Sequence, residues 1–166
     1  MKVSRQLMPL NQAIKHPVKN KSDTIDGVLG KKFGLWSTTK MSFKIGNTTF
    51  GFTMRVPSSD ETKIDDLISS HALWMSETHS LNPEEGKLHT LEYYVSKATE
   101  LNDMMDPSKG LTGNIIYTVS EVHIDDEHFG KHVELGQSWS RIGEFFELFE
   151  KYSPLVTMAG RVSAKL

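Results

Sequence analysis

The stretch GNIIYTVSEVHIDDEHFGKHVELGQSW, residues 113–139, decides the fold of this chain. Its first part, 113–124, is rich in β-branched residues and predicts a strand. Asp125 and Asp126 follow, and either can cap a helix that starts there and continues toward residue 139. A strand that runs through an acidic turn into a helix is typical of a sheet that is covered by helices.

Upstream of this stretch, residues 48–56 alternate apolar with small or polar side chains and predict a strand with one buried face. Residues 57–80 predict a helix, with cap residues at 58–60 and acidic side chains in its first turns. Residues 87–100 predict a second strand, and residues 101–110 predict a loop.

Downstream, residues 140–152 predict a second amphipathic helix, and residues 155–166 predict a last strand. The apolar side of this helix is expected to carry Ile142, Phe145, Phe146 and Phe149. From residue 48 the order is strand, helix, strand, strand, helix, strand. This order predicts an α+β fold with a ferredoxin-like βαββαβ antiparallel sheet and helices on one face.

The pattern also divides the chain. Residues 46–166 are expected to form the ferredoxin-like domain. Residues 1–45 are polar and lysine-rich and are expected to form an N-terminal extension. Residues 32–44, KFGLWSTTKMSFK, predict an extra strand within that extension.

Composition excludes several classes of protein. The 166 residues carry a formal net charge of −2 and no cysteine. Thiolate catalysis, disulfide frameworks and cysteine zinc sites are therefore excluded. No basic face for nucleic acid is indicated, and no apolar run approaches a membrane span. We expect a soluble, cytoplasmic protein with neither nucleic acid nor membrane as a partner.

The strand that ends in SEVHIDDEHFGKHVELGQSW resembles the third strand and following helix of the dimeric α/β-barrel superfamily. In that superfamily an acidic turn leads into a short helix with an apolar residue and a histidine three positions later, here Phe129 and His132. The resemblance covers residues 48–164 and implies a homodimer in which two sheets form a barrel. It also implies a pocket between the sheet and the helices of each subunit. The superfamily includes antibiotic-biosynthesis monooxygenases, heme-degrading monooxygenases and stress-responsive barrel proteins.

The helix predicted at 57–80 carries one apolar stripe, and His71 lies near its centre while His79 lies at its edge. At about 100° per residue the stripe collects every third or fourth position. We therefore expect His71 to face the sheet, to be mostly buried and to have a polar partner. It is either a hydrogen-bonded core residue or a neutral imidazole that transfers protons in a pocket. The stripe comprises Ile64, Leu67, Ile68, His71, Trp74, Met75 and Thr78.

Strand alternation supplies neighbours for His71. His89 and Tyr93 are expected to share one strand face, and Tyr117, Glu121 and His123 to share another. Polar residues at the end of an apolar strand face mark either a pocket rim or an exposed strand end. With His71 as the catalytic residue, the predicted substrate pocket comprises Trp74, Met75, His89, Tyr93, Tyr117, Glu121 and His132.

A metal pair is the remaining candidate site. His128 and His132 are four residues apart on a predicted helix, which is a spacing that can hold a metal ion. Spacing assigns no third ligand to them, so no metal is expected.

The resemblance implies two functions and argues against a third. The first is a cofactor-independent monooxygenase of the antibiotic-biosynthesis type, which acts on a small aromatic or polyketide-like substrate. The alternative is a non-catalytic stress-responsive barrel that at most binds a small hydrophobic or aromatic ligand. Heme degradation is disfavoured, because the first strand offers Arg55 and no asparagine, His132 occupies the tryptophan position, and the segment SRIGEFF has no histidine.

Overall fold

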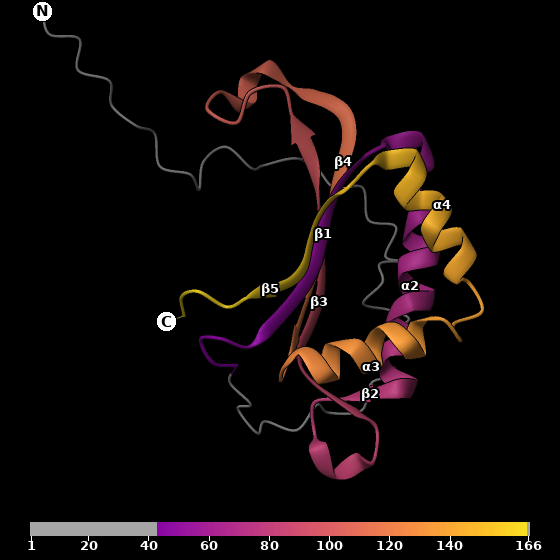
Figure 1. The fold of residues 1–166 in the computed structure, drawn as a ribbon. Helices are drawn as coiled ribbons and strands as arrows, with labels where there is room; N and C mark the ends of the chain where they lie inside the picture. Colours follow the sequence, from indigo (N-terminus) through magenta and orange to yellow (C-terminus); the bar gives the residue numbers. More distant parts are fainter. Residues whose placement is uncertain (1–42, 166) are drawn as a thin grey trace, which may run out of the picture.

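A computed structural model describes residues 43–165 of the chain. These residues form an α+β fold with a five-stranded mixed sheet and three α-helices (Figure 1). The strand predicted at 32–44, and with it nearly all of the extension predicted at 1–45, lies outside the described residues.

The sheet has the strand order β2–β3–β4–β1–β5. Strands β3 and β5 flank an antiparallel centre in which β4 pairs with β1. The short β2 pairs with β3 in parallel, so the prediction of a wholly antiparallel sheet was wrong at this edge. The strands span Thr48–Pro57 (β1), His79–Ser80 (β2), Leu88–Leu101 (β3), Leu111–His123 (β4) and Leu155–Arg161 (β5).

The parallel edge has a simple cause. Helix α2 (Glu61–Thr78) ends beside β3, and the next two residues of the chain form β2. An unpaired strand edge offers free N–H and C=O groups. These two residues pair with that edge at Leu88 and His89 before the chain turns away.

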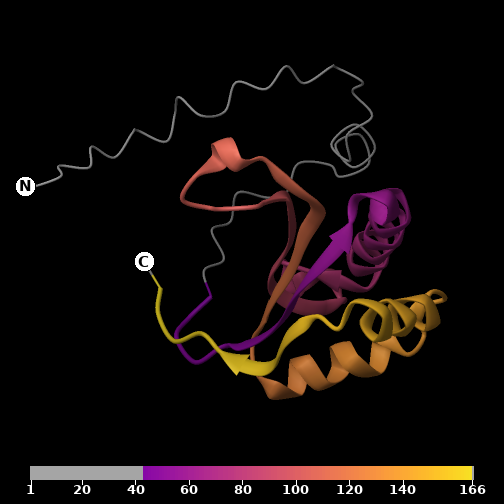
Figure 2. The ribbon, with the colours of Figure 1, turned by 90° about the horizontal axis from the view of Figure 1, so that it is seen from above.

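The helices α2, α3 (Asp126–Gly136) and α4 (Ile142–Tyr152) cover one face of the sheet, as predicted (Figure 1). Figure 2 shows from above that all three lie on the same side of the strands. Asp125 caps α3 as expected, because its side chain accepts a hydrogen bond from the N–H of His128 at 2.9 Å. Asp60 makes no such bond to α2, and its carboxylate accepts instead from Lys151 and Tyr152 on α4.

The core lies between this helical layer and the sheet. On α2 the predicted stripe is buried at Ile64, Leu67, His71, Trp74 and Met75. Opposite it, the buried sheet residues come from the alternating positions of β1 and β4. They are Phe52, Met54, Val56, Ile115, Tyr117 and Val119.

The predicted apolar side of α4 needs one correction. Phe146 is 55% exposed, whereas Leu148 is only 5% exposed. Phe145 and Phe149 both pack against Phe52, so they define the inward face of the helix. Phe146 is turned about 100° from Phe145 and therefore points away from that face.

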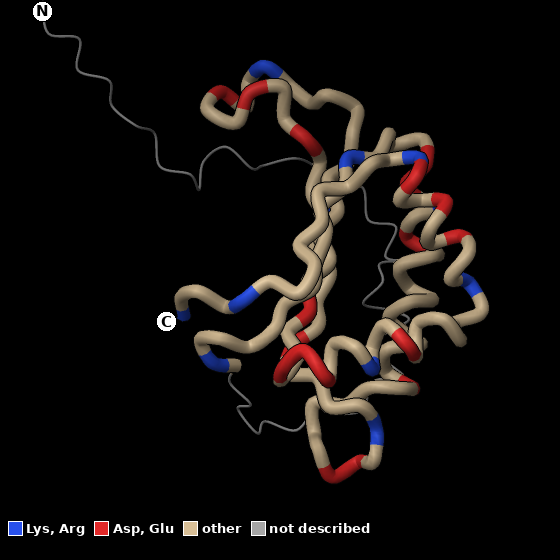
Figure 3. Tube along the Cα trace, in the orientation of Figure 1, with Lys and Arg blue, Asp and Glu red and all other residues tan. Residues whose placement is uncertain are grey.

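Charged positions lie mainly on the helices, the turns and the ends of strands, and the middle of the sheet carries few of them (Figure 3). Within residues 43–165, no helix is both long enough and apolar enough to cross a membrane.

The corrected face of α4 gives a stability test. Leu148→Ala should reduce the free energy of unfolding by about 2–5 kcal/mol, because it leaves a cavity in the core. Phe146→Ala is the matched control and should change it by less than about 0.5 kcal/mol. Urea denaturation followed by circular dichroism measures both, and an equal loss in the two variants would contradict this orientation of α4.

Candidate functional site

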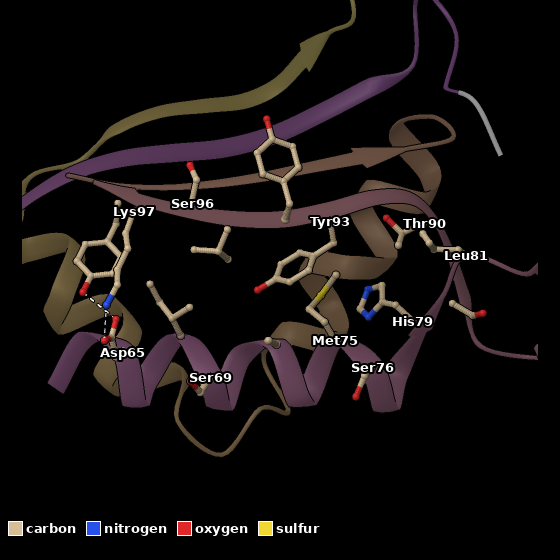
Figure 4. A pocket seen from close by; sticks show the side chains of 16 residues that line it. Asp65, Ser69, Met75, Ser76, His79, Leu81, Thr90, Tyr93, Ser96 and Lys97 are labelled. Carbon is tan, nitrogen blue, oxygen red and sulfur yellow. Dashed lines mark hydrogen bonds and ion pairs between the residues drawn. The ribbon is translucent and has the colours of Figure 1, made fainter. Parts of the chain in front are cut away.

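A cavity of about 500 Å³ lies between α2 and the strands β3 and β4. Its volume is in the range of small-molecule sites. Most of its lining side chains come from one side of α2 and from β3 (Figure 4). Because both elements belong to the core, the wall of the cavity is fixed by the packing of the fold.

The end of the cavity nearest the start of α2 is charged. Lys97 Nζ lies 2.6 Å from Asp65 Oδ2 and 2.8 Å from Glu61 Oε1. The Tyr117 hydroxyl donates to Asp65 Oδ1 at 2.8 Å. Burial and this hydrogen bond both raise the pKa of Tyr117, so its phenol stays protonated. Asp65 therefore joins the two sides of the cavity here (Figure 4).

The other end of the cavity is formed by Met75, His79, Thr90 and Tyr93. A β-bulge between Thr90 and Glu92 shapes it, because Thr90 pairs with His123 while Tyr93 pairs with Glu121. Thr90 and Tyr93 thus face the same side of the sheet although they are three residues apart. The expectation that His89 shares this face with Tyr93 was wrong, since the extra residue moves His89 to the other side.

His71 and Tyr93 form a hydrogen-bonded pair at the wall of the cavity. His71 Nδ1 lies 3.0 Å from the Tyr93 hydroxyl, which confirms that His71 faces the sheet and has a polar partner. The imidazole is otherwise surrounded by the rings of Trp74, Trp139 and Phe145. Tyr93 lines the cavity and His71 does not, so His71 could reach a bound molecule only through the Tyr93 hydroxyl.

Burial sets the protonation of this pair. It lowers the pKa of His71 to about 4, so the imidazole is neutral at pH 7. Burial and the nearby charge of Glu121 raise the pKa of Tyr93 above its usual range. The pair therefore consists of a protonated phenol and a neutral imidazole, and both pKa shifts disfavour a phenolate–imidazolium pair, so a proton passes between them only in concert with a second transfer.

Behind His79 lies a second group of polar side chains, Glu121 and His123 on β4 and His132 on α3, all of them buried. Glu121 Oε2 is 3.1 Å from His123 Nε2 and 3.4 Å from His132 Nε2. His132 Nδ1 lies 3.1 Å from His79 Nε2, which connects the group to the cavity wall. Burial lowers the pKa of both His79 and His132 to about 4.

Apart from His89, which the bulge turns away, the predicted pocket residues separate into three sets. Met75, Tyr93 and Tyr117 line the cavity. Trp74 packs between the rings of His71, His132 and Trp139 in the core. Glu121 and His132 belong to the buried group, so the polar end of the β4 face is neither a pocket rim nor an exposed strand end.

His128 and His132, whose spacing could hold a metal ion although no metal was expected there, have different surroundings. His132 turns into the core, whereas His128 remains partly exposed and bonds to Asp125 at 2.8 Å. Although residues four apart lie on the same side of a helix, the two imidazoles have different partners, Asp125 for His128 and the group around Glu121 for His132.

Four polar residues that line the cavity were not predicted from the sequence: Asp65, Lys97, His79 and Thr90. In the sequence, Asp65 and Lys97 look like ordinary solvated surface charges. Only the packing of α2 on β3 brings them together. For His79 the sequence did offer an indication, because this residue lies at the edge of the apolar stripe of α2. Nothing in the sequence marks the bulge that turns Thr90 inward.

Comparison with known proteins found no family model, no curated protein and no solved structure that matches this chain. The chemistry of the cavity must therefore be inferred from its own side chains.

The buried His71 predicts a pH-dependent stability. Between pH 6.5 and pH 4 the unfolded chain takes up a proton at His71 while the folded chain does not. The stabilising contribution of His71 to the free energy of unfolding is thus fully present above pH 6.5 and is lost as the pH falls toward 4. By pH 5 the loss is about 2 kcal/mol.

His71→Leu removes this proton uptake. The free energy of unfolding should therefore fall about 2 kcal/mol less between pH 7.5 and pH 5 in His71→Leu than in the wild type, as measured by urea denaturation. Tyr93 is the one titratable group among the four rings around His71, and it stays protonated over this range. Identical pH dependence in the two proteins would show that His71 is not held neutral.

Proposed function

We propose that the chain binds a small, largely apolar or aromatic molecule in the cavity between α2 and β3 and oxidises it as a cofactor-independent monooxygenase. The observation that carries this proposal is the Tyr93 hydroxyl in the cavity wall, hydrogen-bonded at 3.0 Å to the buried His71. The resemblance of residues 48–164 to the dimeric α/β-barrel superfamily, which includes antibiotic-biosynthesis monooxygenases, supports the reaction class.

The reaction balances without a cofactor for a substrate that has an activated CH₂ group. The substrate loses a proton, and the resulting carbanion supplies electrons to O₂. One oxygen atom becomes the carbonyl oxygen of the product. The other leaves as water with the two hydrogens of the CH₂ group.

Tyr93 and His71 would move the proton in this scheme. As the phenol proton of Tyr93 passes to His71 Nδ1, the Tyr93 oxygen accepts the proton of the substrate. The reverse transfer delivers a proton to the departing oxygen. Ile68, Ala72 and Val95 make part of the cavity wall apolar, which would limit water around the carbanion.

A second candidate is a non-catalytic protein that binds a small ligand in the same cavity. It is favoured by one observation: His71 lies outside the cavity lining, and burial makes its imidazole a weak base. The two candidates share the ligand class and differ in whether oxygen is consumed.

We also propose the ferredoxin-like topology and the dimeric barrel. The order β3–β4–β1–β5 supports the topology, with β2 as an addition at the edge. The sheet face away from the helices supports the dimer. By strand register this face carries Leu155, which is 80% exposed, and Tyr94, which is 49% exposed, beside the bonded pair Thr53 and Thr118. A second sheet would cover these residues.

The catalytic proposal predicts a separation of binding from turnover. Tyr93→Phe and His71→Leu should keep the affinity for an aromatic compound with an activated CH₂ group, followed by tryptophan fluorescence. Both should lower oxygen consumption by about 100-fold, because proton transfer is lost. Phe146→Leu is the control and should not affect either quantity, since Phe146 is 55% exposed on α4 and does not line the cavity.

Wild-type protein that binds such compounds but consumes no oxygen would support the non-catalytic candidate. Turnover that is unchanged in both Tyr93→Phe and His71→Leu would contradict the role of the pair.

The dimer predicts a mass of twice 18.7 kDa by light scattering at micromolar concentration. Leu155→Asp should lower the mass toward that of a monomer, because it places a charge in the sheet-to-sheet contact. Met104→Asp, in the loop between β3 and β4, is the control and should leave the mass unchanged. A monomeric wild-type protein would refute the barrel.

A further inference from the structure

The buried group of Glu121, His123 and His132 has no role in the proposed oxidation. The side chains of Glu121 and His123 are 0% exposed, and that of His132 is 9% exposed. Among residues 43–165, the ion-pair partners of Glu121 are these two histidines, and no lysine or arginine reaches it. A carboxylate in such a position requires a compensating positive charge or a proton.

Hydrogen bonds fix the orientation of the protons in this group. The Thr78 hydroxyl donates to the carbonyl of Trp74 at 2.7 Å, so it must accept from His79 Nδ1, also at 2.7 Å. His79 Nε2 then carries a lone pair and accepts from His132 Nδ1 at 3.1 Å. In a neutral His132 this leaves the Nε2 lone pair directed at Glu121.

Two acceptors therefore face each other across 3.4 Å, the lone pair of His132 Nε2 and Glu121 Oε2. A charge-assisted N–H···O bond would be shorter, about 2.7–2.9 Å. Glu121 Oε1 is buried and has no hydrogen-bond partner among residues 43–165. A proton alone therefore accounts poorly for this geometry.

We infer that Glu121, His123 and His132 bind a divalent first-row transition-metal ion. Two ligands that each lie 2.0–2.2 Å from one ion are separated by roughly 3.3–3.6 Å at a tetrahedral angle and by roughly 2.8–3.1 Å at a right angle. The Glu121 oxygen has separations of 3.1 and 3.4 Å from the two imidazole nitrogens. One ligand atom from each residue lies within 4.8 Å of the others.

The surroundings of the site favour metal ligation. His79 orients His132 through the hydrogen bond to Nδ1, which is how metal-bound histidines are usually held. Phe50, Phe129 and Trp74 surround the His132 ring and exclude water. Two imidazoles and one carboxylate, with no thiolate, suit zinc and iron(II). An ion there would join α3 to β4 behind the cavity, and this inference does not rest on the proposed oxidation.

Direct titration tests the site. The full chain is stripped with a chelator and titrated by calorimetry with zinc, and with iron(II) under anaerobic conditions. One equivalent of at least one of the two ions should bind with a dissociation constant of about 10 μM or lower, and the thermal midpoint should rise with metal concentration. Absence of binding by both metals would overturn the inference.

Variants locate the ion. Glu121→Gln and His132→Gln should each weaken binding by about 100-fold or more. His128→Gln is the matched control on the same helix and should stay within about 3-fold of the wild type, because its side chain lies outside the group. Equal affinity in Glu121→Gln, His132→Gln and the wild type would show that the metal binds elsewhere and would also overturn the inference.

His79 is a positioning residue, and two substitutions separate its role from packing. His79→Gln keeps an acceptor for His132 Nδ1 and should retain the affinity for the metal. His79→Leu fills similar space without an acceptor and should weaken it by about 10–100-fold. If Glu121→Gln fails to fold, His132→Gln and this pair still locate the site, and a metal affinity unaffected by all of them contradicts it.

Discussion

The burial of the Glu121 carboxylate is the constraint that organises the part of the molecule where α3 packs on β4. Glu121 is placed under α3 by the alternation of β4, which also buries Tyr117 and Val119. Burial of the charge without compensation would cost far more than the hydrophobic contacts around it contribute. Two histidines are therefore turned toward Glu121, and a third, His79, orients one of them from the end of α2.

The same constraint extends into the cavity. Tyr93 lies opposite Glu121 on the neighbouring strand, and the negative charge helps to keep its phenol protonated. Protonated Tyr93 is in turn the hydrogen-bond partner of His71. The buried group and the cavity wall are thus electrostatically connected, although they are built from different helices.

Much of the fold could be predicted from periodicity alone. The strands near 48–56, 87–100 and 113–124 and the stripe of α2 lie where the pattern placed them, because each buries one regular face. Phe146 was assigned wrongly because a face that includes Ile142, Phe145, Phe146 and Phe149 is wider than the sheet can cover. The cavity residues Asp65 and Lys97 were missed because ion pairs between distant elements leave no local pattern. The bulge at Thr90, which decides that His89 turns away, depends on pairing with β4 and cannot be read from β3 alone.

The two ends of α2 are fastened by interactions of different kinds. At its start, Lys97 joins Glu61 and Asp65 through partly exposed ion pairs. At its end, the chain continues into β2, and the buried His79 bonds to His132. Dissolved salt screens exposed charges over a distance of about 8 Å at physiological ionic strength but hardly affects buried hydrogen bonds. Ionic strength therefore loosens α2 at one end only, so the charged end of the cavity responds to the salt of the medium while the histidine end does not.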